Sequence, residues 1–232
     1  HPQASLTFWG LQPGMTIVEI NPGAGSWWTK ILAPYAHRTG GRYYAGYVDL
    51  GAPNVSEAAR NARAAFEREY GDATIYGDVE AVNFGVASGL ALPDSSADFI
   101  LVARAFHNWA RAEGVTDRFM AEFARVLEPG GVLAVEQHRA AEGADVSVTA
   151  PTGYVPESYV IAAAERAGLR LAARSELNAN PRDDRDHPFG VWTLPPTRRS
   201  SPQGQPPDPT FDHAPYDAIG ESDRMTLQFV KP

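Results

Sequence analysis

Short apolar runs alternate with longer segments of helical period along most of this sequence, and this alternation limits the fold more than any other feature. A buried strand followed by a helix forms a β-α-β unit, whose strands pair in parallel. The run at 98–106 is almost wholly apolar, as a strand covered on both faces must be. The sequence therefore predicts an α/β fold with a mostly parallel sheet and helices on both faces.

Seven runs are predicted as strands, separated by segments predicted as helices. The strands are Thr16–Ile20, Arg42–Val48, Ala81–Ala87, Asp98–Phe106, Val132–Glu136, Leu169–Leu177 and Met225–Val230. The helices are Ser26–Tyr35, Val55–Tyr70, Gly114–Val126 and Tyr154–Ala167. Ser56 can cap the second helix, and Glu128-Pro129-Gly130-Gly131 predicts a turn before the fifth strand. The last strand is expected to insert antiparallel beside Leu169–Leu177. Its alternating apolar residues make it the remaining partner for that edge of the sheet.

Residues 1–232 are interpreted as a single domain with an insert at 178–223. The insert is rich in Pro, Asp and Arg and poor in aliphatic residues. Long segments without regular structure are more often functional or mobile than idle in a compact domain. We therefore expect the insert to act as a lid.

Charge and composition exclude several classes of protein. The 20 Lys and Arg residues against 28 Asp and Glu residues give a net charge of -8, which disfavours a nucleic-acid partner. The chain has no cysteine, so thiol nucleophiles, Cys-ligated zinc and disulfides are excluded. No apolar run approaches the roughly 20 residues that cross a bilayer. The chain opens at His1 without an initiator Met, which leaves a cleaved signal peptide and a trimmed terminus as alternatives.

The first predicted strand leads into a Gly-rich turn, Val18-Glu19-Ile20-Asn21-Pro22-Gly23-Ala24-Gly25. Gly23 and Gly25 precede a helix, where a ligand can approach the backbone closely and meet free N–H groups. Asp49 ends the second strand, where a carboxylate can accept both hydroxyls of a ribose. A structural Gly turn with a surface Asp is the alternative interpretation.

This turn resembles the first motif of the class I methyltransferases. Leu127-Glu128-Pro129-Gly130-Gly131-Val132-Leu133 resembles their fifth strand with its turn, and Leu92-Pro93-Asp94-Ser95-Ser96-Ala97-Asp98-Phe99-Ile100 resembles the approach to their fourth strand. The resemblance covers Pro13 to Gly168. It implies a Rossmann-like, seven-stranded, mostly parallel sheet with an antiparallel last strand, and S-adenosylmethionine as cofactor. The cofactor-binding residues it implies are Glu19, Asn21, Gly23, Gly25, Asp49 and Ser88.

The chain departs from this family at two of these residues. Asn21 stands where the family has the first Gly of its turn, and Asn tolerates left-handed backbone angles but adds a side chain near the ligand. After the third strand the family usually supplies Asp or Glu for the adenine amine, whereas this chain has Ser88. A serine hydroxyl can accept one hydrogen bond there, so it is a poorer anchor.

The chain is also similar to a group of bacterial predicted methyltransferases. The segments that carry this similarity are His107-Asn108-Trp109, Glu136-Gln137-His138-Arg139-Ala140, Asp186-His187-Pro188 and Val191-Trp192-Thr193-Leu194-Pro195-Pro196. Many members carry export signals, so the similarity implies a signal peptide and a periplasmic location, with the cytoplasm as the alternative.

Polar residues follow the fourth and fifth predicted strands, at the sheet edge where ligands of α/β proteins bind. His107 and His138 can face one pocket there, or each can cap its own strand by bonding to backbone. With His187 from the insert they are the candidate catalytic residues, and either of the first two is suited to act as a base. The candidate substrate-binding residues are Asn108, Trp109, Asn178 and Asn180.

Two function classes remain open. One is an S-adenosylmethionine-dependent methyltransferase acting on a small or medium-sized acceptor. The other is an exported, non-catalytic binding protein on the same fold, holding a metal or small ligand through His and Asp residues. A divalent metal is possible because the insert and the strand ends together offer enough carboxylate and imidazole ligands: Asn178, Asn180, Asp183, Asp184, Asp186 and His187, with His107 and His138. Their spacing matches no metal-binding template, and for the segment around Asp186 and His187 a solvated turn is the simpler interpretation. A nicotinamide dehydrogenase is opposed by Asn21 and by the antiparallel last strand.

Overall fold

A computed structural model describes residues 1–23 and 25–232, so Ala24 of the Gly turn lies outside the described residues. The strands form one sheet in the order β4-β3-β2-β1-β5-β6-β8-β7. Their bounds are Thr16–Ile20 (β1), Arg42–Val48 (β2), Val79–Gly85 (β3), Gly89–Leu90 (β4), Ala97–Ala103 (β5), Leu127–His138 (β6), Arg170–Ser175 (β7) and Arg224–Val230 (β8). The central strands pair in parallel, whereas β8 lies antiparallel between β6 and β7. The predicted Rossmann-like α/β fold with an antiparallel last strand is confirmed.

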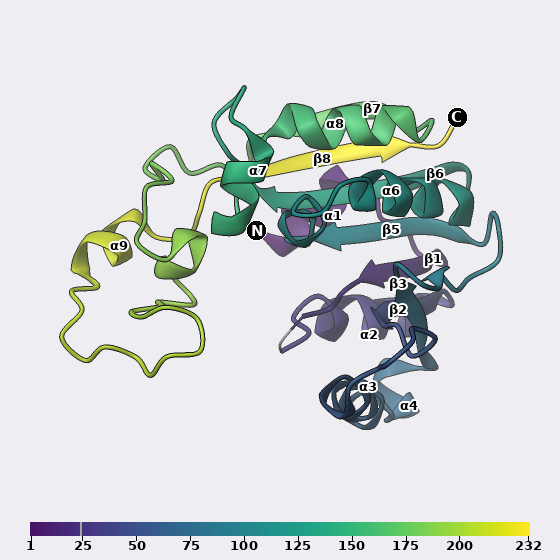
Figure 1. The fold of residues 1–232 in the computed structure, drawn as a ribbon. Helices are drawn as coiled ribbons and strands as arrows, with labels where there is room; N and C mark the ends of the chain where they lie inside the picture. The colour runs from purple at the N-terminus through teal and green to yellow at the C-terminus, as the bar shows by residue number, and fades with distance from the viewer. Residues whose placement is uncertain (24) are drawn as a thin grey trace.

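Helices cover both faces of this sheet (Figure 1). Their bounds are Pro2–Phe8 (α1), Thr29–Thr39 (α2), Glu57–Glu69 (α3), Ala73–Tyr76 (α4), Phe106–Trp109 (α5), Val115–Val126 (α6), Val146–Thr149 (α7), Glu157–Arg166 (α8) and Ala214–Ile219 (α9), with 3-10 turns at Ala150–Thr152 (η1) and Gly190–Thr193 (η2). Alternate residues of β1 point to opposite faces, as in any strand. Val18 packs into a core with α6 and α8, and Ile17 packs into a second core with α2 and α3.

Local capping fixes the ends of two of these helices. The Ser56 hydroxyl accepts a hydrogen bond from the backbone N–H of Ala59 at 3.1 Å, so the predicted cap of α3 is confirmed. Helix α2 ends at Gly40, whose left-handed backbone (φ 77°) suits glycine. This helix begins three residues after the predicted Ser26 and continues past Pro34 to Thr39.

Five of the seven predicted strands have other bounds in the structure: β3, β5, β6, β7 and β8. The sheet has eight strands among the described residues rather than seven, because the two-residue strand β4 pairs antiparallel with the end of β3. Strand β6 begins at Leu127, which pairs with Ala97, and the register then skips to the pair of Phe99 with Val132. The predicted turn at 128–131 is thus an irregularity inside a strand, formed because Leu127 also finds a partner in β5.

The prediction that the fourth strand runs to Phe106, directly before His107, Asn108 and Trp109, was wrong. Strand β5 ends at Ala103, and Arg104 takes a left-handed conformation (φ 56°) that no strand can continue through. Residues 106–109 then form the single helical turn α5. They still lie at the carboxyl end of β5, so they remain at the predicted edge of the sheet.

The insert at 178–223 lies at the same edge, beyond the carboxyl ends of the parallel strands (Figure 1). Because β8 runs antiparallel, its first residue Arg224 pairs with His138, the last residue of β6. The buried carboxylate of Asp223 holds this region together, accepting hydrogen bonds from Arg139, from Arg185 and from the backbone N–H of Asn180 at 2.7 to 3.0 Å. None of the described helices has the length and apolarity that a membrane crossing requires.

Candidate active site

A cavity of about 350 Å³ opens at the carboxyl edge of the sheet, between the Gly turn and the insert. Its walls come from four parts of the chain: the Gly turn, the segment after β5, the end of β6 with the start of β8, and the insert. The lining residues are Asn21, Pro22, Gly23, Trp27, Ala103, Arg104, Ala105, His107, Asn108, His138, Val191, Trp192, Pro195, Pro196, Thr197, Ser222 and Arg224. The volume is in the range of small-molecule sites.

The Gly turn has the open, left-handed backbone that a bound cofactor needs. Asn21, Gly23 and Gly25 all have positive φ, at 50°, 70° and 82°. A Cβ placed on Gly25 would meet nothing within 4 Å, so the backbone there faces open space. Asn21 adopts the left-handed angle that the family's Gly would take, and its side chain lies at the cavity wall. The turn therefore fits a cofactor that approaches the backbone.

Asp49 lies at the end of β2, but its carboxylate already accepts hydrogen bonds from its own protein. Ser88 donates its hydroxyl at 2.6 Å and its backbone N–H at 3.0 Å, and Gly51 donates its N–H at 3.0 Å. Although desolvation opposes them, these hydrogen bonds lower the pKa of Asp49. Leu50 and Val86, both exposed apolar residues, follow β2 and β3 at the same edge. The site thus fits a ribose and a flat apolar ring once the Ser88 hydroxyl turns aside.

Glu19 lies beneath the Gly turn rather than on the cavity wall. Its side chain is 2% exposed and accepts hydrogen bonds from Tyr43 at 2.7 Å and from Thr29 at 2.9 Å. Burial raises the pKa of Glu19 to about 7, against the hydrogen bonds from Tyr43 and Thr29 and the charge of Arg104, which lower it. This carboxyl group ties the start of α2 to β1 and β2, which shapes the turn from below.

The structure brings His107 and His138 together, with ring centroids 6.2 Å apart. Burial, followed by the charge of Arg111, lowers the pKa of His107 to about 4. Burial and the charge of Arg224 hold the pKa of His138 well below its usual value. Both imidazoles are therefore neutral at neutral pH, and a neutral imidazole can accept a proton through one nitrogen and donate through the other.

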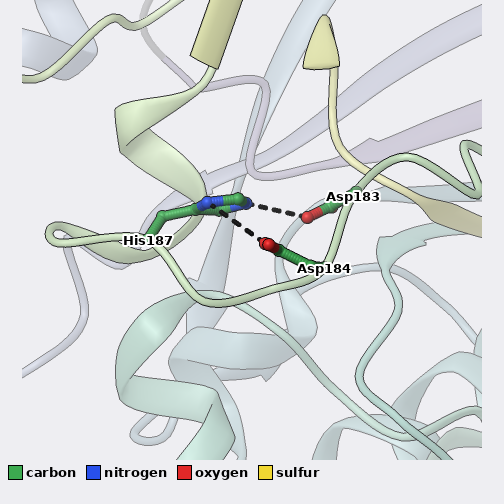
Figure 2. A group of neighbouring side chains, drawn as sticks. All are labelled: Asp183, Asp184 and His187. Carbon is green, nitrogen blue, oxygen red and sulfur yellow. Dashed lines mark hydrogen bonds and ion pairs between the residues drawn. The ribbon is translucent and has the colours of Figure 1, made fainter. Parts of the chain in front are cut away.

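His187 does not line this cavity, because Tyr154 stands between it and His138. The ring centroids of His138 and Tyr154 lie 6.2 Å apart, and those of Tyr154 and His187 lie 6.4 Å apart. The Nε2 atom of His187 bonds to Asp183 at 2.8 Å, and its Nδ1 atom lies 3.6 Å from Asp184 (Figure 2). The three candidate catalytic histidines thus form a chain of neighbours rather than a single ring around one ligand.

The same cluster of Asp183, Asp184 and His187 is where the described residues could hold a metal ion. Asp183 is buried and already accepts hydrogen bonds from the Tyr154 hydroxyl, from His187 and from the backbone N–H groups of Arg185 and Asp223. A carboxylate has about four acceptor positions, so these donors fill it. The geometry favours a structural hydrogen-bond network over a metal site.

The four candidate substrate-binding residues have different surroundings. Asn108 lines the cavity, whereas Trp109 is buried in the core against Phe106 and Phe119. The side chain of Asn178 donates to the hydroxyls of Ser5 and Thr226. The side chain of Asn180 donates to backbone carbonyls at residues 219 and 221. Asn178 therefore holds the start of the insert against β8 and α1, and Asn180 ties the start of the insert to its end.

The sequence reasoning missed several cavity residues, among them Arg104, Trp192, Ser222 and Arg224. Arg104 follows β5 directly, and that position at a strand end was the available signal. Ser222 and Arg224 precede and begin an antiparallel strand, whose amino end meets the carboxyl ends of its neighbours. Trp192 lies in a segment that sequence patterns assign to a loop, and its ring packs edge-on to His107 with centroids 5.7 Å apart.

The sheet order, the Gly turn and the carboxylate at the end of β2 give this chain the Rossmann-like fold of methyltransferases. Residues 21–135 match the family model of a methyltransferase domain. This match, together with the fold, supports a class I methyltransferase with S-adenosylmethionine as its cofactor. No curated protein sequence matches the chain.

Solved structures of methyltransferases share this fold. A SAM-dependent methyltransferase from Aquifex aeolicus is 25% identical, with a TM-score of 0.53 over 75% of this chain and 82% of that one. Geranyl diphosphate C-methyltransferase from Streptomyces coelicolor, in complex with Mg²⁺, geranyl-S-thiolodiphosphate and S-adenosyl-L-homocysteine, is 14% identical, with a TM-score of 0.61 over 99% and 74%. The (4+2)-cyclase SpnF is 18% identical, with a TM-score of 0.60 over 99% and 79%.

Proposed function

We propose that the protein is an S-adenosylmethionine-dependent methyltransferase that acts on a small or medium-sized acceptor. One observation carries this proposal: the cavity extends without a break from the Gly turn to the paired imidazoles of His107 and His138. The donor and the acceptor of a methyl group must meet in line, and one continuous cavity permits that alignment. The insert at 178–223 supplies its outer wall and is proposed as the lid that excludes water.

The residues of the cofactor half have separate tasks in this proposal. When bound, S-adenosylmethionine supplies an electrophilic methyl group on a sulfonium centre. The open backbone at Gly23 and Gly25 receives its amino acid end, and Asp49 accepts the ribose hydroxyls. Glu19 holds α2 against the sheet from below. Ser88 gives up its hydroxyl contact with Asp49 when the ribose arrives.

The histidines at the acceptor end of the cavity remove a proton when the acceptor atom carries one. A neutral His107 or His138 accepts the proton as the acceptor lone pair forms its bond to the methyl carbon and the carbon–sulfur electron pair returns to sulfur. Asn108 lies at the cavity wall as a further contact for the acceptor. His187 is proposed as a positioning residue: it holds Asp183, which holds the Tyr154 ring beside His138.

Calorimetric titration with S-adenosyl-L-homocysteine tests the proposal. We expect the unmodified protein to bind it and Asp49→Ala to lose about 1.5 to 3 kcal/mol, the usual range for hydrogen bonds to a charged group. Asp212→Ala removes an exposed carboxylate from the insert and serves as the matched control, with unchanged affinity expected. An unmodified protein that binds neither S-adenosyl-L-homocysteine nor S-adenosylmethionine would contradict the proposal.

A second candidate is an exported, non-catalytic binding protein on this fold. The hydrogen bonds from Ser88 to Asp49 favour this candidate, because they occupy the carboxylate oxygens that would accept the ribose hydroxyls. The (4+2)-cyclase SpnF shows that the fold also occurs in a protein named for another activity. Ser88→Ala separates the two candidates: tighter S-adenosyl-L-homocysteine binding supports the methyltransferase, and continued absence of binding supports the second candidate. Cell fractionation tests the periplasmic location that belongs to it.

A further inference from the structure

The cavity holds one positive charge that no described side chain pairs with directly. Two arginines line it, Arg104 and Arg224, and among residues 1–23 and 25–232 no Asp or Glu does. Arg224 forms ion pairs with Glu136 at 2.9 Å and with Glu221 at 2.5 Å. The guanidinium of Arg104 makes no hydrogen bond or ion pair with any described side chain. Arg104 is therefore the cation that a bound ligand meets.

The backbone at Arg104 is held in an uncommon conformation at this place. Its φ of 56° is left-handed, which is unfavourable for a non-glycine residue. Its N–H donates to the carbonyl of Glu136 in β6 at 2.7 Å, which fixes the bend. Backbone strain of this kind is retained most often where function uses it. Here it turns the chain out of β5 at the cavity wall.

His138 adds a hydrogen-bond donor beside this cation. The Ser222 hydroxyl accepts from Arg224 Nε at 3.3 Å and lies 2.6 Å from His138 Nδ1. Because the hydroxyl hydrogen finds no other acceptor among the described residues, we assign it to Nδ1. The neutral ring then carries its own hydrogen on Nε2, the nitrogen left to face the cavity. His138 therefore donates to a ligand, which leaves His107 as the base.

Flat aromatic side chains line the same cavity as these two donors. Trp27 lines the cavity with 49% of its surface exposed, and Trp192 lines it from the insert. The ring of Trp192 stands edge-on to His107. An aromatic ring between two indoles gains stacking and apolar burial together.

We propose that the methyl acceptor is an aromatic carboxylate, whose anionic group is held by Arg104 and His138 and whose ring lies between Trp27 and Trp192. This inference rests on the proposed function and deepens it by naming the substrate class. The proposal requires that the ligand carboxylate form a hydrogen-bonded ion pair with Arg104. Such charge-assisted hydrogen bonds are about twice as strong as neutral ones.

Binding of 2-naphthoate and of its neutral counterpart 2-naphthamide, with S-adenosyl-L-homocysteine at saturation, tests the inference. We expect the carboxylate to bind at least about 10-fold more tightly than the amide, in line with the usual strength of hydrogen bonds to charged groups. Arg104→Asn keeps a residue that tolerates the left-handed backbone and should remove this preference. Arg104→Lys should restore part of it, and Arg60→Gln, an exposed arginine on α3, should change neither affinity.

The outcomes separate this inference from the proposed function. Equal binding of the two probes, or no binding of 2-naphthoate, overturns the inference even where S-adenosyl-L-homocysteine binds well. Weaker S-adenosyl-L-homocysteine binding by Arg104→Asn with an unchanged probe preference also overturns it, because Arg104 would then serve the cofactor carboxylate. The probe ratio in the unmodified protein decides the matter if Arg104→Asn does not fold. Failure of S-adenosyl-L-homocysteine to bind the unmodified protein counts against the proposed function.

Discussion

Replacing Glu19 with Gln should make the protein more stable at alkaline pH. The carboxyl group is 2% exposed, and burial raises its pKa from the ordinary 4.5 to about 7. In the unfolded chain the group loses its proton at lower pH than in the folded chain. Its contribution to stability is therefore complete below pH 4.5 and is lost as the pH rises through 7.

The magnitude follows from the two pKa values of Glu19. Fully ionised, the buried carboxylate costs about 3 kcal/mol relative to its protonated form. Gln carries no charge and can still accept the hydrogen bonds from Tyr43 and Thr29. The free energy of unfolding of Glu19→Gln should therefore rise relative to the parent by about 2 to 3 kcal/mol between pH 5 and pH 8.

Urea unfolding at pH 5 and pH 8, followed by tryptophan fluorescence, measures this difference. Glu165→Gln, an exposed carboxylate on α8, is the matched control and should show no such dependence on pH. The reasoning would be refuted if the two proteins differed in free energy of unfolding by the same amount at both pH values. Ionisation of the buried Glu19 would then cost no stability.

Two further substitutions test how the fold is held together. Ser56→Ala removes the cap of α3 and should lower the free energy of unfolding by about 1 kcal/mol, measured by urea titration; an unchanged value would mean that the 3.1 Å hydrogen bond contributes nothing. Asp223→Ala leaves Arg139 and Arg185 without their buried partner and should cost about 3 kcal/mol. The same variant should expose the insert to trypsin, and unchanged cleavage would show that Asp223 does not hold the insert.

Features that depend on local sequence could be predicted before the structure. The bounds of β1 and β2 were predicted residue for residue, because apolar runs between turn residues specify strands locally. The cap at Ser56 was predicted because it involves a hydroxyl and an N–H three residues apart. The Gly turn also follows from a pattern within one segment, whereas the antiparallel β8 followed from the sheet edge left without a partner and from the family resemblance. These patterns were sufficient for the fold class and for the location of the candidate site.

The roles of individual site residues were decided by contacts between segments far apart in the chain. Sequence proximity cannot reveal that Ser88 bonds to Asp49 or that Tyr154 separates His187 from His138. It cannot reveal the pKa of Glu19 either, because desolvation depends on which side chains surround the group. The sequence alone determined a Rossmann-like sheet with a ligand site at its carboxyl edge. Only the tertiary structure decided which polar groups are already bonded and which, like Arg104, remain for a ligand, because hydrogen-bond partners are chosen in space.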